Sequence, residues 1–240
     1  MKSLITMVLV LVFAVSAGFA AEQPRVQSEV LSPTVITLPR VPNPGCEVGN
    51  LVDPVFNYGN WIMGGEKYAY LIDPINEGCS CEDGFVLETV YMRMQFGPED
   101  VPATFDARGS LAEAVWDPTR GVYVPGEIYC SGPLWSITAD VAGLYDIFVD
   151  LDGGCGCAAN NEPYFILFQL PNGFVWWPDA MEDDTPEVGL SWYDSGNGWM
   201  DLVADFGWWG NNIMHADVNC CTDPVSSEET PFGQLKSYYR

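Results

Sequence analysis

Eight cysteines place the tightest limit on how this chain can fold. Six of them stand in close pairs, in the order Cys46, Cys79, Cys81, Cys130, Cys155, Cys157, Cys220 and Cys221. An even number of cysteines fits either structural disulfides or a thiolate metal site. Zinc sites usually separate their paired cysteines by two to four residues, whereas here one residue or none intervenes. The spacing therefore favours disulfides.

The two members of each close pair are predicted to bond to different, distant partners, because a disulfide between such near neighbours would strain the backbone. The count alone leaves the connectivity open. The best single prediction joins Cys46 to Cys220 or Cys221, since this bond would tie the start of the fold to its last strand.

The N-terminus predicts the compartment. Residues 1–20 combine the positive Lys2, an apolar stretch over residues 4–15 and small residues that fit signal-peptide cleavage after Ala20. A membrane anchor is the alternative, but a spanning helix needs about 20 apolar residues. No cysteine follows the cleavage region to carry a lipid, and no later segment predicts a membrane span. We expect a secreted protein, extracellular or on the cell surface of a bacterium, where disulfides form.

Charge excludes one class of partner. The chain has 33 acidic residues against nine Lys and Arg, with a formal net charge of -24. A nucleic-acid-binding protein must offset phosphates with Lys and Arg, so no nucleic-acid partner is expected. The 48% apolar content is too high for a disordered acidic polymer.

Four regions follow along the chain: a signal peptide (1–20), a Pro-rich extended lead-in (21–45), a stapled domain (46–221), and a polar linker with an aromatic and basic C-terminal tail (222–240). The domain consists of short apolar or alternating runs broken by Gly, Pro, Asn and Asp, and no segment has a sustained helical period. Strands are predicted at 68–72, 85–96, 112–116, 122–129, 134–140, 144–151, 164–170, 174–177, 190–193, 200–205 and 213–218. This pattern predicts an all-β fold, an antiparallel β-sandwich of jelly-roll type with disulfide-stapled loops.

Catalytic motifs are absent from the sequence. It contains no nucleophile elbow, no zinc-protease helix motif and no phosphate-binding glycine loop. His215 is the only histidine, and its alternating position in a strand favours a surface or hydrogen-bonded role. Paired carboxylates could serve a glycosidase, but candidates such as Glu88 and Glu182 carry no weight in so acidic a chain. No cofactor is required by this sequence.

Calcium is a possible ligand of one Gly-rich loop. Asp150, Asp152, Asn160 and Glu162 offer hard oxygen atoms of the kind that calcium prefers. The loop departs from the EF-hand pattern, since Gly154 stands at the third ligand position. Asp194, Asn197 and Asp201 form a second oxygen-rich loop. The alternative for both loops is a turn in which Asp and Asn bond only the backbone.

Aromatic residues are the more informative feature for binding. Adjacent strand residues face opposite sides, so one member of each of two Trp pairs should point away from the core. The candidate ligand-binding residues are Trp176, Trp177, Trp192, Tyr193, Trp199, Trp208 and Trp209, with Asp194 and Asn197 in the neighbouring polar loop. Outward rings could stack on a sugar or cover a face in an assembly, while the alternative is a second packing layer under a loop.

Three segments, residues 95–102, 194–202 and 216–221, resemble a group of uncharacterised secreted bacterial proteins that share Gly-Cys-x-Cys turns and a terminal Cys-Cys. The resemblance covers most of the mature chain and implies no known activity or ligand. Residues 211–218 are similar to the final strand of jelly-roll adhesin-like modules. Residues 232–240 are similar to Trp-Gly-x-Ile-Lys-x-x-Tyr-Arg tails of other exported bacterial proteins, with Phe232 in place of the Trp.

Together these features predict a secreted, non-enzymatic binding or structural module whose exposed aromatic residues meet a glycan or an extracellular protein. The alternative function is a secreted glycoside hydrolase that uses paired carboxylates. The tail after Cys221 ends in apolar, basic and aromatic residues, and it is predicted to be a separable element that engages a sorting or surface partner.

Overall fold

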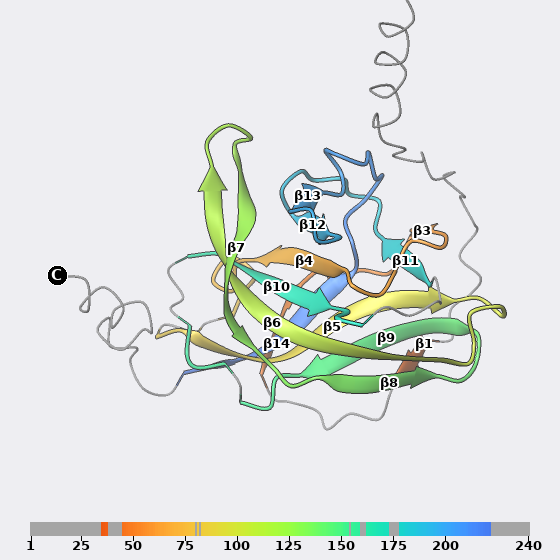
Figure 1. Ribbon diagram of the computed structural model, residues 1–240. Helices are drawn as coiled ribbons and strands as arrows, with labels where there is room; N and C mark the ends of the chain where they lie inside the picture. The colour runs from red at the N-terminus through yellow and green to blue at the C-terminus, as the bar shows by residue number, and fades with distance from the viewer. Residues whose placement is uncertain are drawn as a thin grey trace, which may run out of the picture.

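The computed structural model describes residues 35–37, 45–79, 81, 83–153, 155–158, 162–172 and 178–221. The predictions for the signal peptide, most of the lead-in, the strand at 174–177 and the C-terminal tail lie outside these residues. The described residues form fourteen strands and no helix (Figure 1), and so none of them belongs to a helix that could cross a membrane.

Two seven-stranded sheets make up the fold. The first sheet contains β1 (Val35–Thr37), β2 (Cys46–Gly49), β3 (Phe56–Tyr58), β5 (Phe85–Phe96), β9 (Gly143–Asp150), β11 (Asp179–Glu182) and β14 (Met214–Cys220). The second contains β4 (Lys67–Ile72), β6 (Ala103–Asp117), β7 (Val122–Ser131), β8 (Trp135–Ala139), β10 (Tyr164–Gln169), β12 (Ser191–Asp194) and β13 (Met200–Asp201). Every pairing is antiparallel except that of β1 with β9. β1 lies within the segment predicted as the extended lead-in.

The strand pairing is that of a jelly roll. Four antiparallel pairs nest from the ends of the domain inward: β2 with β14, β4 with β10, β5 with β9, and β6 with β7. The pairs fall alternately into the first and the second sheet, as when one long hairpin is rolled into a sandwich. The prediction of an antiparallel sandwich of jelly-roll type is confirmed.

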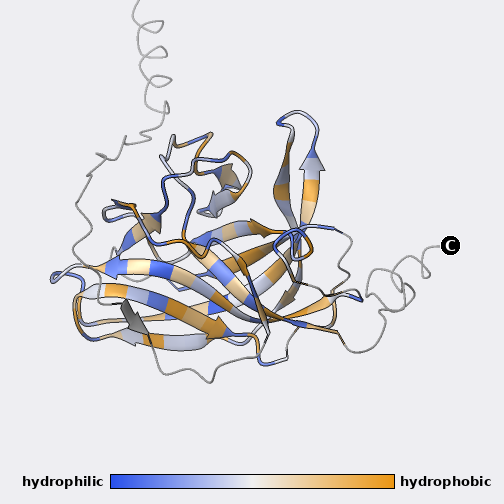
Figure 2. Cartoon of the chain, turned by 180° about the vertical axis from the view of Figure 1, so that it is seen from behind, coloured by the Kyte–Doolittle hydropathy of each residue, from blue (hydrophilic) through white to orange (hydrophobic). Residues whose placement is uncertain are grey.

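The core lies between the two sheets, and alternation along the strands fills it (Figure 2). Met92 and Met94 of β5 point inward, as do Ile147 of β9 and Phe168 of β10, and all four are fully buried. Gly109 of β6 lets the sheets approach each other, because an added Cβ would lie 3.0–3.2 Å from side chains of β5, β9 and the β9–β10 loop.

Four disulfides use all eight cysteines: Cys46–Cys79, Cys81–Cys220, Cys130–Cys155 and Cys157–Cys221. The members of each close pair bond to different partners, which confirms that prediction. The prediction that Cys46 joins Cys220 or Cys221 is wrong. Cys46 lies opposite Val218 in the β2–β14 register, so β14 runs two residues further and places Cys220 opposite Phe85. At that position Cys220 is bonded to Cys81, while Cys46 is bonded to Cys79.

The disulfides gather at one end of the sandwich. β2 begins there, β14 ends there, and the β4–β5 and β9–β10 connections carry Cys79, Cys81, Cys155 and Cys157 at the same end. β4 runs from the opposite end toward these bonds, and β14 begins at that opposite end. The connections at the opposite end are consequently free of disulfides, and they carry most of the described aromatic candidates.

Candidate functional site

Six aromatic side chains form one continuous cluster at the end of the sandwich remote from the disulfides. We call this set the aromatic cluster: Tyr58, Trp61, Tyr68, Tyr193, Phe206 and Trp208. Trp61 is its centre, with ring centroids 5.2 Å from Phe206, 5.1 Å from Trp208 and 5.7 Å from Tyr193. Trp61, Tyr193 and Phe206 are half-buried, whereas the other three rings are buried. The cluster thus presents three rings toward solvent on a buried aromatic base.

Strand register brings part of the cluster together. Tyr193 of β12 lies directly opposite Tyr68 of β4, so the two side chains share the inner face of the second sheet. Their ring centroids are 5.5 Å apart. Trp61 follows β3 on a turn in which Asn60 has a φ of 54° and donates its amide to Asp179. The ring of Tyr58, at the end of β3, stacks on Trp208 at 4.2 Å.

A turn stabilised by Asp201 positions Phe206 and Trp208 in the aromatic cluster. The Asp201 carboxylate is fully buried, and its Oδ1 accepts hydrogen bonds of 2.9 Å from the amides of Val203 and Ala204. The predicted strand at 200–205 is therefore wrong beyond Asp201, because this carboxylate captures the amides that a strand would pair. The Gly207 amide then donates to the Val203 carbonyl at 2.9 Å and completes the turn.

A buried carboxylate lies beneath the exposed rings. Glu66 is 5% exposed and accepts three hydrogen bonds, from the Tyr193 hydroxyl at 2.5 Å, the Tyr68 hydroxyl at 2.7 Å and the Met63 amide at 2.8 Å. Burial raises the pKa of Glu66 above its ordinary value, although these hydrogen bonds partly offset the effect. Burial and the Glu66 carboxylate also raise the pKa values of Tyr68 and Tyr193.

The raised pKa of Glu66 predicts a stability change with pH. When folding raises the pKa of an acid, the protein loses stability as the pH rises from the pKa of the unfolded chain, 4.5, through the pKa of the folded protein. Glu66→Gln removes this loss. The stability of the variant relative to the wild type should therefore be greater at about pH 7.5 than at about pH 4. Urea unfolding at both pH values measures the difference. Glu187→Gln, at an exposed position, is the control, and an equal pH response in both variants would contradict the prediction.

Asp194 and Lys67 form an ion pair on the outer face of the second sheet, because they alternate with Tyr193 and Tyr68 of the inner face. Lys67 Nζ lies 2.9 Å from Asp194 Oδ2 and 5.8 Å from the centroid of the Trp199 ring. Burial alone would raise the pKa of Asp194, but hydrogen bonds from Lys67 and from the amides of Gly196 and Gly198 outweigh it and lower this pKa. The Asp194 carboxylate is therefore buried, paired with Lys67 and bonded to two backbone amides.

The structure separates the candidate binding residues into three groups. Tyr193 belongs to the aromatic cluster, whereas Trp199 and Asp194 lie with Lys67 on the other face of the sheet, and Asn197 is exposed on the adjoining loop. Trp192 is 0% exposed and Trp208 is buried, so neither ring is accessible from solvent. Trp209 is 42% exposed and meets Phe56 edge-on at 5.6 Å, although this Trp pair lies in a loop and not in a strand, so strand alternation does not apply to it. Trp176 and Trp177 lie outside the described residues.

The sequence analysis missed Trp61, Phe206 and Glu66. Trp61 and Phe206 lie in loops without periodicity, and Glu66 is one of 33 acidic residues. Glu66 and Tyr193 are 127 residues apart in sequence. Only the pairing of β4 with β12 brings these two side chains together.

The calcium candidates do not form a common site among the described residues. Asp150 Oδ1 accepts a 2.8 Å hydrogen bond from the Thr89 hydroxyl, Asp152 has a φ of 54° in an exposed turn, and Glu162 is exposed. Asn160 lies outside the described residues, within which no three His, Cys, Asp or Glu side chains gather as a metal site. Calcium binding by this loop stays a prediction.

His215 has a packing role in β14. Its ring stacks on Tyr91 at 4.3 Å with an interplanar angle of 6°, and the Tyr91 hydroxyl donates to Asp217 Oδ2 at 2.8 Å. His215 is 9% exposed. This environment agrees with the structural interpretation of the histidine rather than with a catalytic one.

Comparisons with known proteins give a fold likeness alone. No protein-family model matches the sequence, and no curated protein matches it. Among solved structures, the chain is similar to the cysteine protease and lectin-like domains of Cwp84, a surface layer associated protein of Clostridium difficile, with a TM-score of 0.43 and 13% identity. The match covers 66% of this chain and 33% of that chain, so it spans about a third of the other protein. A likeness at this level carries no information about function.

Proposed function

We propose that this protein is a non-catalytic extracellular carbohydrate-binding module and that Trp61, Tyr193 and Phe206 form its sugar-stacking surface. The observation that supports this function is the mutual contact of three half-buried rings, with Tyr193 and Phe206 packed on Trp61. The apolar face of a sugar ring packs on such rings, and neighbouring oxygen atoms accept hydrogen bonds from its hydroxyls. Four disulfides suit an oxidising extracellular compartment.

Charge narrows the ligand to neutral or basic glycans. The Glu66 carboxylate lies beneath the rings, and the basic side chain of Lys67 is engaged in an ion pair with Asp194 on the outer face of the sheet. The chain as a whole has a formal charge of -24. Such a surface repels anionic polysaccharides over a distance set by the salt concentration. Sugar hydroxyl groups, by contrast, can donate to its carboxylates.

Retention on insoluble neutral polysaccharides such as cellulose, chitin and xylan tests the proposal. Trp61→Ala is expected to weaken retention by about 30-fold, the effect of losing a central aromatic anchor. Trp116→Ala is the matched control, because Trp116 is 53% exposed on the β6–β7 hairpin, outside the aromatic cluster. Tyr193→Phe keeps the ring and should retain binding within a few-fold. Wild-type affinity in a folded Trp61→Ala protein, verified by its melting temperature, would contradict the proposal.

Glycoside hydrolysis is the alternative outcome of this experiment. A hydrolase requires two carboxylates placed on either side of the scissile bond, and it would release reducing ends from a polysaccharide. If the wild type releases reducing ends and Glu66→Gln does not, the protein is a glycoside hydrolase and the proposed binding function is wrong. Retention without release of reducing ends supports the module.

We also propose that the C-terminal tail, residues 222–240, serves sorting or attachment. The tail follows the last disulfide cysteine, Cys221, and carries Lys236 and Arg240 on an otherwise acidic chain. Deletion of residues 223–240 should leave the melting temperature nearly unchanged but alter where the protein accumulates. Thermal unfolding and cell fractionation measure the two effects. A large loss of stability, or unchanged surface retention, would contradict the proposal.

A further inference from the structure

The β6–β7 hairpin reaches across the outer face of the second sheet. A small apolar cluster covers that face, formed by Ala69, Ala112, Phe165, Leu167 and Trp192 of β4, β6, β10 and β12. Val122, Tyr123 and Val124 of β7 pack against this cluster. In the sheet order, β6, β10 and β4 separate β7 from β12. The hairpin therefore links one edge of the sheet to the strand that carries Tyr193.

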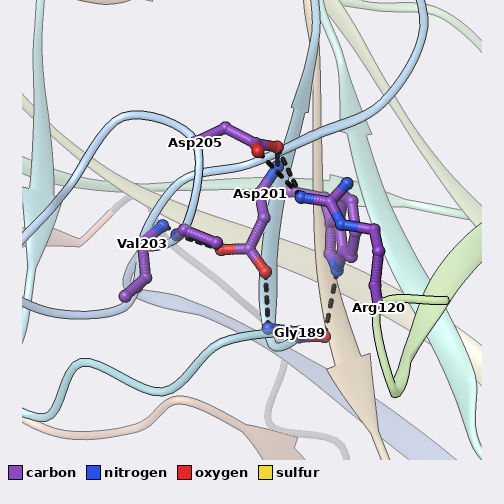
Figure 3. A network of polar contacts seen from close by, with 7 residues as sticks. Arg120, Gly189, Asp201, Val203 and Asp205 are labelled. Atoms are coloured by element: carbon purple, nitrogen blue, oxygen red, sulfur yellow. Dashed lines mark hydrogen bonds and ion pairs between the residues drawn. The ribbon is translucent and has the colours of Figure 1, made fainter.

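Arg120 lies at the tip of this hairpin and binds Asp205, which follows β13 at the far edge of the sheet (Figure 3). Its Nη2 atom lies 2.8 and 2.7 Å from the two carboxylate oxygens of Asp205. Its guanidinium carbon lies 4.9 Å from the centroid of the Trp192 ring. The Trp192 indole N–H in turn donates to the Gly189 carbonyl at 2.9 Å. A planar guanidinium can bond both oxygens of a carboxylate while its flat face stacks on a ring, a geometry that the point charge of a lysine does not reproduce.

Asp205 connects Arg120 to the turn that carries Phe206. Its Oδ2 accepts the Asp201 amide at 2.7 Å, and the Asp201 carboxylate accepts the amides of Val203, Ala204 and Gly189 (Figure 3). Phe206 is the next residue after Asp205. Its ring contacts Trp61 at 5.2 Å and Tyr193 at 5.7 Å. One chain of contacts thus runs from the hairpin tip to an exposed ring of the aromatic cluster.

We propose that Arg120 is a positioning residue that holds the 201–207 turn and, through it, seats Phe206 against Trp61. This inference rests on the proposed function, because the seated ring is one of the three that would stack on a sugar. Without Arg120, Asp205 loses its cation, and the second half of the turn is held only by hydrogen bonds within the turn, while Asp201 and Leu202 stay bonded to Gly189 and Ser191. Phe206 then leaves Trp61 for part of the time, and the stacking surface has two rings instead of three.

Amide hydrogen exchange tests the positioning without a ligand. In Arg120→Ala, exchange at the amides of Val203, Ala204 and Gly207 should rise about tenfold while the amides of β5 stay unchanged. Arg120→Lys keeps the charge but loses the paired hydrogen bonds, so it should lie between Arg120→Ala and the wild type. In an Asp205→Asn background, Arg120→Ala should add little further exchange, since both changes break one contact. Unchanged exchange at the turn, or a uniform rise across the protein, would overturn the inference.

Binding to the neutral polysaccharide that retains the wild type is the second readout. Arg120→Ala should weaken retention about fivefold with little change in melting temperature, and Thr119→Ala at the neighbouring exposed position should retain wild-type binding. Loosening of the turn with unchanged affinity would overturn the link between Arg120 and the binding surface. Absence of glycan binding by the wild type, with the turn still loosened in Arg120→Ala, would overturn the proposed function alone and leave the role of Arg120 in seating Phe206 supported.

Discussion

Replacement of both Cys81 and Cys220 by alanine is expected to lower the free energy of unfolding by about 5 kcal/mol, a large part of the stability of a domain of this size. This disulfide closes the longest loop, with a sequence separation of 139 residues, and the entropy that a cross-link removes from the unfolded chain grows with loop length. Cys130–Cys155 spans only 25 residues, so its removal should cost about 3.5 kcal/mol.

Urea unfolding of the two double variants compares these losses directly. Both bonds lie at the same end of the sandwich, so the comparison varies loop length while the environment changes little. Equal losses, or a larger loss for Cys130 and Cys155, would show that native-state packing around the sulfur atoms outweighs chain entropy. Full reduction of all four disulfides should unfold the domain at ordinary temperature.

Trp192→Ala is expected to destabilise the fold by about 3–5 kcal/mol, because it empties a large volume that the surrounding strands cannot fill. The ring is fully buried, meets Phe165 edge-on at 6.5 Å and supports Arg120. Trp209→Ala, at a position 42% exposed, is the matched control and should cost less than about 1 kcal/mol. Denaturant unfolding gives both values. Loss of glycan binding without loss of stability in Trp192→Ala would instead make this residue a ligand contact.

The strands that alternate cleanly are the ones that the sequence predicts best. The predicted strand at 85–96 coincides with β5, since its inward apolar positions fill the core. β6 begins at Ala103, nine residues before its predicted start at 112. Its first half contains Asp106, Arg108 and Gly109, which resemble a loop. In the structure, however, Gly109 is the point where the two sheets come close together, so a residue that weakens the strand signal is required by packing.

Three short strands were not predicted. β2, β3 and β11 have three or four residues each, and β2 and β11 form along the longer strands β14 and β5 rather than through their own composition. Cys46 illustrates the consequence. Without β2 in the prediction, nothing showed that β14 extends past Cys46 to reach Cys81.

Part of the candidate site was predictable from local sequence. Tyr193, Trp199 and Asp194 were recognised as aromatic and polar neighbours, but the structure places only Tyr193 in the aromatic cluster, with Asp194 and Trp199 around Lys67 on the other face of the sheet. Trp192 does point away from the main core, opposite Ala69 on the outer face of β4. The β6–β7 hairpin covers that face, and alternation within one strand cannot reveal a cover supplied by another part of the chain.

Nuclear magnetic resonance on the ¹⁵N-labelled protein tests the proposed binding surface most directly. Soluble neutral oligosaccharides of glucose, N-acetylglucosamine and xylose serve as probes while the indole N–H signals are followed. Trp61 belongs to the half-exposed part of the aromatic cluster, and Trp116 and Trp135 are exposed elsewhere on β6 and β8. We expect a saturable shift of the Trp61 signal with at least one probe, while the signals of Trp116 and Trp135 stay in place. Shifts at Trp116 or Trp135 with Trp61 unmoved, or no shift with any neutral probe, would contradict glycan binding by the aromatic cluster.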